Sequence, residues 1–162
     1  MKLKDVSIRV RETEIKYDGR ESLAAKYISE KTMSACNQPY KLKSMLINYF
    51  KAFEDEKERF AVLMFDTKLK LIGINLVSIG SLNRTQVHMR EAFRAAIVCG
   101  ANSVMTAHNH PSGEVEPSTD DYVLFDKMEK AGQLLGISVL DNFVVSTKGE
   151  GKIYSDTSCE AI

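Results

Sequence analysis

The spacing of apolar positions along the chain changes near residue 59 and predicts two kinds of structure. Before the change, residues 41–53 carry a helical stripe made of Leu42, Met45, Leu46, Tyr49, Phe50 and Phe53. After it, residues 60–65 (FAVLMF) are continuously apolar, as expected of a strand covered on both faces. A turn at residues 66–68 leads to a second predicted strand at residues 71–79, so these two strands are expected to form a hairpin.

Helices and strands then alternate. Residues 89–99 have helical spacing and stop at Gly100, and residues 118–135 have it and stop at Gly136. Further strands are expected at residues 104–108, 138–146 and 152–155. The order strand, strand, helix, strand, helix, strand, strand predicts an α/β domain with a mixed sheet flanked by helices on both faces.

The first part of the chain is predicted to be an extension. We expect residues 1–40 to form it and residues 41–162 to form the α/β domain. Alternating apolar positions within residues 6–17 indicate one or two short strands, and residues 22–33 have the spacing of a helix.

Composition narrows the class of protein. At 162 residues, with 44% hydrophobic and 27% charged side chains, the chain is typical of one soluble globular domain. Lys+Arg and Asp+Glu both number 22, so no overall charge favours nucleic acid or an anionic membrane. No stretch approaches the ~20 apolar residues of a membrane span. The cysteines, Cys36, Cys99 and Cys159, are far apart and form no C-x-x-C motif, which argues against a disulfide framework and favours a cytoplasmic location.

Two of the three histidines, His108 and His110, stand two residues apart at the end of a predicted buried strand. Residues i and i+2 of a strand face the same side, so both imidazoles can converge on one point. The carboxyl ends of strands are also where open α/β sheets place ligands. A lone buried histidine is usually a satisfied core residue, whereas this pair favours a metal site.

Ser118 and Asp121 allow two interpretations. Ser-x-x-Asp before a helix is a capping-box pattern, and that structural role alone would explain both residues. However, the loop after His110 is only seven residues long, so the first helical turn can fold back over the end of the strand. Asp121 could then add a carboxylate oxygen to two imidazole nitrogens, and such a set with an open position for water is typical of catalytic zinc.

A water activated by zinc needs a base to accept its proton. Glu58 stands where the charged segment of residues 54–58 (EDEKE) meets the predicted buried strand, and Glu91 lies in the first turn of the helix at residues 89–99. Composition prefers neither residue, because a solvated surface glutamate is the ordinary interpretation of each.

The motif residues closely resemble a known family. HNHPSG at residues 108–113, the Pro-Ser-x-x-Asp segment ending at Asp121, and AGQLLGISVLDNFVVS are similar to RadC-like proteins of the JAB/MPN superfamily of JAMM metalloproteases. The resemblance covers about residues 58–155 and includes ERFAVLMFD, LVSIGSLN and VHMREAFRAA. It implies the JAMM/MPN fold, a cytidine-deaminase-like α/β sandwich.

The resemblance also implies roles for individual residues. By position, His108, His110 and Asp121 match the family's zinc ligands. Ser118 matches the serine that steadies the carbonyl oxygen and the tetrahedral intermediate, and Glu58 matches the general acid/base. Two positions depart from many RadC-like sequences: Met89 replaces a proline, and Asn142 replaces a histidine.

The implied activity is zinc-dependent hydrolysis, in which metal-activated water attacks a peptide or isopeptide carbonyl. The expected partner is a peptide or an isopeptide-linked protein, with the chain acting as a monomer or homodimer. One alternative is a non-catalytic MPN-type module that binds a partner. Another is a DNA-repair-associated protein. Arg84, Arg90 and Arg94 could form a basic face for it, but a solvated helix surface is the ordinary interpretation of these residues, and the usual helix-hairpin-helix segment is not recognisable.

Overall fold

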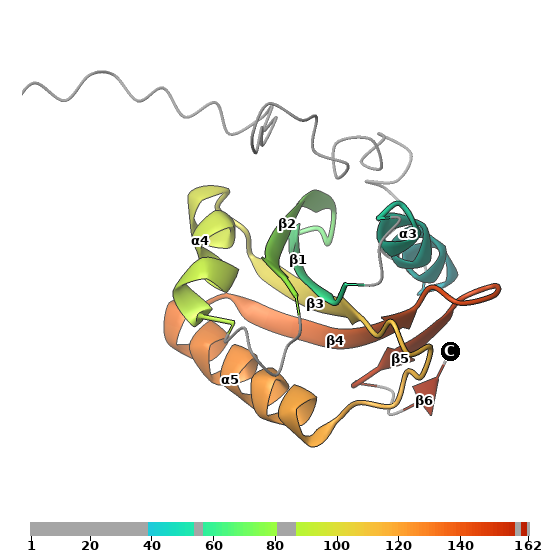
Figure 1. Ribbon diagram of the computed structural model, residues 1–162. Coiled ribbons are helices and arrows are strands. Elements are labelled where there is room, and N and C mark those ends of the chain that lie inside the picture. Colours follow the sequence, from blue (N-terminus) through green and yellow to red (C-terminus); the bar gives the residue numbers. More distant parts are fainter. Residues whose placement is uncertain (1–38, 54–56, 81–86, 158–159, 162) are drawn as a thin grey trace, which may run out of the picture.

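A computed structural model describes residues 39–53, 57–80, 87–157 and 160–161 (Figure 1). Its elements are α3 (Pro39–Lys51), β1 (Arg59–Phe65), β2 (Leu71–Ile79), α4 (Met89–Val98), β3 (Ser103–Asn109), α5 (Thr119–Leu135), β4 (Ser138–Ser146), β5 (Lys152–Ser155) and β6 (Glu160–Ala161). Every element predicted from residue 41 onward is present, with its ends within two residues of the prediction. The short strand β6 was not predicted. The strands and helix predicted within residues 6–33 lie outside the described residues.

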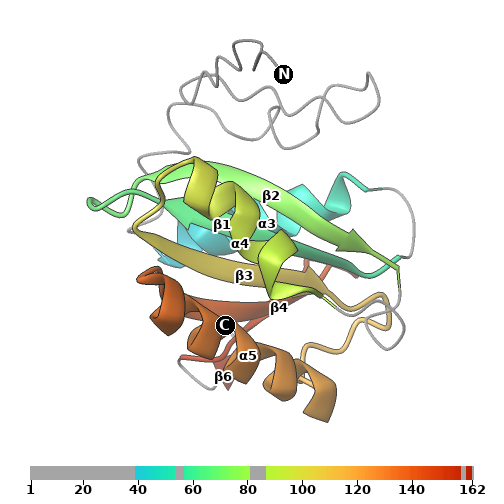
Figure 2. The same ribbon diagram turned by 90° about the vertical axis from the view of Figure 1, so that its left-hand side faces the viewer.

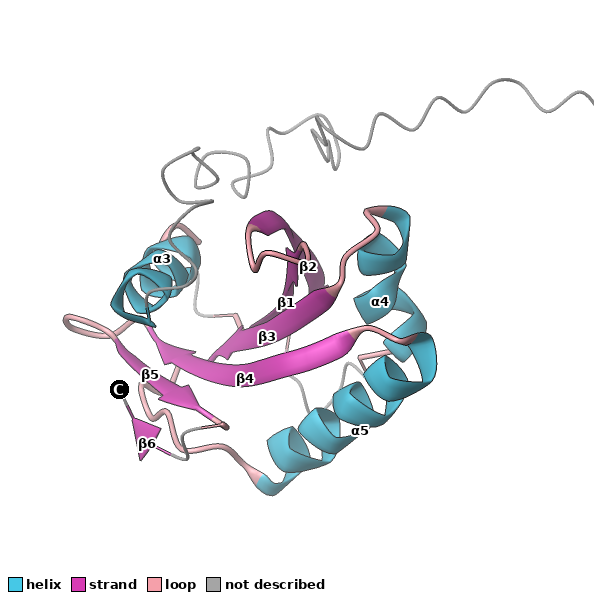
Figure 3. Cartoon of the chain, turned by 180° about the vertical axis from the view of Figure 1, so that it is seen from behind, coloured by secondary structure: helices cyan, strands magenta, loops and turns pink. Residues whose placement is uncertain are grey.

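The six strands form one mixed sheet in the order β2-β1-β3-β4-β5-β6. Strands β3 and β4 are parallel and are connected by α5, whereas every other neighbouring pair is antiparallel. Helix α3 covers one face of the sheet, and α4 and α5 cover the other (Figures 2 and 3). The predicted α/β class with helices on both faces is therefore confirmed.

Strand β1 shows why its sequence is continuously apolar. All seven of its residues are buried. Ala61, Leu63 and Phe65 belong to the cluster on the α3 side of the sheet. The alternate residues, Phe60, Val62 and Met64, pack on the α4 and α5 side. A strand with a helix layer on each side has no solvent-facing positions, so polar alternation is lost.

The β1–β3 register and the start of α5 position the chemistry-bearing residues. The two antiparallel strands place Phe60 opposite His108. Helix α5 begins with Ser118 as its N-cap and ends at Gly136, whose φ of 69° is the left-handed conformation that glycine adopts without strain. The strand–loop–helix sequence thereby brings the first turn of α5 to the carboxyl end of β3.

The packing of α3 makes a testable contribution to stability. Leu46 of α3 is fully buried against the sheet, so Leu46→Ala is expected to lower the free energy of unfolding by about 2–5 kcal/mol. The matched control is Leu134→Ala in α5, where the side chain is 88% exposed and the expected change is within about 0.5 kcal/mol. Urea denaturation measures both, and equal effects would show that α3 does not pack on the sheet as described.

Candidate metal centre

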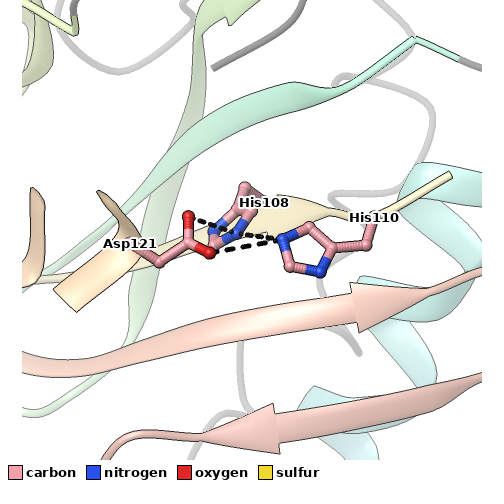
Figure 4. Close-up of side chains that lie close together, drawn as sticks. All are labelled: His108, His110 and Asp121. Atoms are coloured by element: carbon pink, nitrogen blue, oxygen red, sulfur yellow. Dashed lines mark hydrogen bonds and ion pairs between the residues drawn. The ribbon is translucent and has the colours of Figure 1, made fainter. Parts of the chain in front are cut away.

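Three side chains from β3, its following loop and α5 meet at the carboxyl end of β3 (Figure 4). The Nε2 atoms of His108 and His110 are 3.0 Å apart. Asp121 places Oδ1 3.1 Å from Nε2 of His108 and Oδ2 3.4 Å from Nε2 of His110. The structure therefore brings together the three residues whose spacing favoured a metal site.

The backbone fixes both histidines. His108 lies within β3 and is fully buried, and its ring stacks on Phe60 of β1 with 6.5 Å between ring centroids. His110 follows the strand, but its backbone N–H still donates to the carbonyl of Val145, 2.9 Å away, and so continues the parallel pairing of β3 with β4. The two imidazoles thus keep the same-face relation of a strand even though the strand has ended.

The loop between His110 and α5 has its own anchors. The side chains of Val115 and Pro117 are buried beneath it. Gly113 adopts a φ of 97°, which strongly favours glycine, and its N–H donates to the carbonyl of His110 at 3.1 Å. These contacts turn the chain sharply enough for α5 to begin beside the histidines.

Asp121 serves as a capping residue and as a member of the cluster at the same time. Its Oδ2 accepts hydrogen bonds from the backbone N–H of Ser118 at 2.7 Å and from the Ser118 hydroxyl at 2.6 Å. The N–H of Asp121 in turn donates to the Ser118 Oγ, which completes the capping box. Because the cap uses Oδ2, Oδ1 remains directed at His108. The two interpretations left open by the sequence are therefore compatible.

The second nitrogen of His110 defines its chemistry. Nδ1 lies 3.0 Å from the carbonyl oxygen of Glu114, an acceptor, so Nδ1 carries a hydrogen and donates it. The neutral ring then has its lone pair on Nε2, inside the cluster, which is the arrangement that metal-binding histidines usually have. For His108, the buried Nδ1 has no hydrogen-bond partner among the described residues.

The charges of the cluster favour a cation. Burial alone would raise the pKa of the Asp121 carboxyl, but hydrogen bonds from His108 and His110 outweigh burial and hold this pKa well below its ordinary value. Burial alone would lower the pKa of His110, yet its contacts with Asp121 and Glu114 and the charge of Glu58 raise it. The protein therefore keeps the carboxylate ionised and attracts positive charge, a proton or a metal ion, to Nε2 of His110.

Glu58 lies near the cluster in the chain pairing, two residues before Phe60, which pairs with His108. The β1–β3 register ends at that pair, so the link between Glu58 and the cluster is the electrostatic one. The contribution of its charge to the raised pKa of His110 agrees with this position.

Glu91 and Cys99 have other surroundings. Glu91 forms ion pairs with Arg94 at 3.1 Å and with Arg90 at 3.5 Å on the exposed side of α4. Those contacts partly neutralise Arg90 and Arg94 of the basic face considered for nucleic acid, whereas Arg84 lies outside the described residues. Burial raises the pKa of the Cys99 thiol, which is opposite to the shift that activates a cysteine nucleophile. The other two cysteines lie outside the described residues.

Sequence reasoning missed Asn109, the residue between the two histidines. Asn109 is buried, and its Oδ1 accepts from the N–H of Arg59 at 2.8 Å. Its Nδ2 donates to the carbonyl oxygen of Lys57 at 3.1 Å. The available signal was a polar amide at a buried strand position, because such a group needs hydrogen-bond partners.

The chain is similar to known proteins. The RadC-like JAB domain family matches residues 36–158. Over 107 residues the chain is 45% identical to the UPF0758 protein Mbar_A2303 of Methanosarcina barkeri, covering 66% of this chain and 45% of that protein. Over 94 residues it is 40% identical to a UPF0758 protein of Thermotoga maritima, covering 58% and 42% respectively.

The chain spans less than half the length of these relatives, and their names state no activity. No helix among the described residues is long and apolar enough to cross a membrane. The observed mixed sheet between helix layers is consistent with the JAB/MPN fold. On the extent of the family match, the chain belongs to the RadC-like JAB domain family.

Proposed function

We propose that the chain is a zinc-dependent metallopeptidase or isopeptidase-like hydrolase. The observation that supports this function is the convergence of two imidazole nitrogens and an ionised carboxylate, with a second carboxylate, Glu58, whose charge acts on His110. A hydrolase of this type needs a metal, a proton carrier and a donor for the developing oxyanion.

The donor set fits zinc. His108, His110 and Asp121 would hold the ion through two nitrogens and one oxygen, the combination found in catalytic rather than structural zinc sites. One ligand atom from each of the three residues lies within 4.8 Å of the other two, so a single ion could contact all three. Zinc bound there would act as a Lewis acid towards a carbonyl and would lower the pKa of a bound water to about 7.

Glu58 is proposed as the proton carrier. It is partly exposed immediately before β1, and its charge acts on His110. In hydrolysis a water oxygen bonds to the carbonyl carbon and the C–N bond breaks. Glu58 takes the proton released by the water and returns it to the leaving amine.

Ser118 is proposed as the oxyanion donor. Ser118 is exposed, and its hydroxyl donates a hydrogen bond to Oδ2 of Asp121. For the hydroxyl to reach a substrate oxygen, this hydrogen bond has to be exchanged for one to the substrate. The backbone N–H of Ser118 continues to hold Oδ2, so Asp121 keeps its orientation during the exchange.

The proposed substrate is a peptide or a protein carrying an isopeptide bond, since both contain the amide carbonyl that this chemistry attacks. A non-catalytic partner-binding module of the same fold is the alternative. It needs neither a metal nor a proton carrier, so turnover that depends on Glu58 distinguishes the two.

Metal affinity tests the role of Asp121. Asp121→Asn replaces an ionised buried ligand with a neutral amide, so zinc affinity is expected to fall by at least about 100-fold, more than contacts beyond the ligands usually contribute. Asp120→Asn is the matched control, because it removes the same charge from an exposed position in the same helical turn and should leave affinity unchanged. Competition with a fluorescent chelator measures both. Loss of thermal stability with unchanged zinc affinity would mean that Asp121 is only a capping residue.

Kinetics test the proton carrier. Glu58→Gln keeps the size of the side chain but cannot accept a proton, so kcat on a peptide or isopeptide substrate is expected to fall by roughly 100- to 10,000-fold with zinc content unchanged. Glu91→Gln is the control. Glu91 forms an ion pair with Arg94 on α4, so this variant should retain activity. The assignment is wrong if Glu91→Gln loses turnover and Glu58→Gln keeps it.

A further inference from the structure

Asn109 holds the backbone on both sides of Glu58. One amide group accepts from the N–H of Arg59 and donates to the carbonyl of Lys57, the two residues that flank Glu58. The oxygen and one N–H of a primary carboxamide lie on the same side of the group, so a single asparagine side chain can make both bonds. The paired register of β1 and β3 ends at Phe60 and His108, so the side chain of Asn109 continues the contact beyond the backbone ladder.

Other contacts restrain the same segment. The N–H of Gly80, at the end of β2, donates to the carbonyl of Glu58 at 2.8 Å. The Arg59 guanidinium donates to the carbonyl of Lys57 at 3.1 Å and lies 4.2 Å from the centre of the Phe53 ring. The backbone of Glu58 is therefore fixed from β2 and from β3, although its side chain reaches solvent. Of these contacts, only the Asn109 amide bonds to both flanking residues.

Asn109 has different partners from the two histidines that flank it. His108 and His110 meet at the candidate metal centre, whereas the Asn109 side chain hydrogen-bonds the backbone on both sides of Glu58. A buried carboxamide offers a donor and an acceptor without charge. An aspartate would lack the N–H that donates to the carbonyl oxygen of Lys57. The His-Asn-His segment can thus serve two groups, with its outer residues at the candidate metal centre and its middle residue at the segment that carries Glu58.

We infer that Asn109 is a positioning residue, which fixes the backbone at Glu58 so that the carboxylate lies beside His110. The part of this inference that concerns turnover rests on the proposed hydrolase. The structural part does not, because the hydrogen bonds exist without metal or substrate. A shift of about 1 Å in a proton carrier is enough to lower turnover by roughly 100-fold, so restraint at this position has a functional consequence.

Hydrogen exchange measured by NMR on the metal-free protein tests the restraint. In Asn109→Ala the N–H of Arg59 loses its acceptor and is expected to exchange roughly tenfold faster, while the N–H of Thr106, in the middle of β3, keeps its rate. The matched control is Asn142→Ala, which removes another buried side-chain amide of the sheet. Asn142 accepts a hydrogen bond from the Thr106 hydroxyl at 2.6 Å. This variant should leave the exchange rate of the Arg59 N–H unchanged. Unchanged exchange at Arg59 in Asn109→Ala overturns the inference.

Kinetics of the zinc-loaded protein test whether Asn109 acts through Glu58. Asn109→Ala is expected to lower kcat by roughly 10- to 100-fold, with KM and zinc content unchanged. In the Glu58→Gln background the same substitution should cause no further loss. An equal loss in both backgrounds, or loss of zinc, would show a general structural role and would overturn the positioning role.

Two further comparisons keep the outcomes distinct. If Asn109→Ala does not fold, Asn109→Ser is used, because its hydroxyl is too short to reach both Lys57 and Arg59, and the same outcomes apply. If zinc-loaded wild-type protein shows no turnover on any peptide or isopeptide substrate, the hydrolase proposal fails. The exchange rate of Arg59 then decides by itself whether Asn109 restrains this segment.

Discussion

The hydrogen bonds of the Asp121 carboxylate connect the fold to its chemistry. One oxygen closes the first turn of α5 through Ser118, and the other faces His108 at the end of β3. A buried carboxylate is costly unless it is paired, and here its partners are the backbone N–H and hydroxyl of Ser118 and the two imidazoles. The same group therefore fixes where α5 begins and supplies the negative charge of the candidate metal centre, so neither feature can move without the other.

In the absence of a metal, a proton can occupy part of its place. His110 donates through Nδ1 to Glu114, and its raised pKa means that Nε2 is readily protonated and then donates to Asp121. Nε2 of His108 lies 3.0 Å from the same nitrogen. A metal ion bound there would displace the proton, so metal binding and the protonation of His110 would be linked.

Local patterns in the sequence predicted most of the fold. Helical stripes, the apolar run of β1 and the glycines after α4 and α5 are encoded by near neighbours, and the elements were found within two residues of their predicted ends. The grouping of His108, His110 and Asp121 was also accessible, because two histidines on one strand and a short loop limit where the next helix can start. Strand β6 was missed since two residues give no periodicity to detect.

Composition left Glu58 and Glu91 equivalent, and the family resemblance alone favoured Glu58 as the proposed base. Both are glutamates at the start of an element. What separates them is the pairing of β1 with β3, two strands about 50 residues apart in the chain. Composition does not reveal the register of that pairing. The role of Asn109 was hidden for the same reason, since its partners lie at the start of β1. Once the register is known, a period of two along β3 separates the functions of three consecutive residues. His108 and His110 lie at the candidate metal centre, and Asn109 between them hydrogen-bonds the backbone on both sides of Glu58. Strand β3 therefore sets the spacing between the proposed metal ligands and the proposed base.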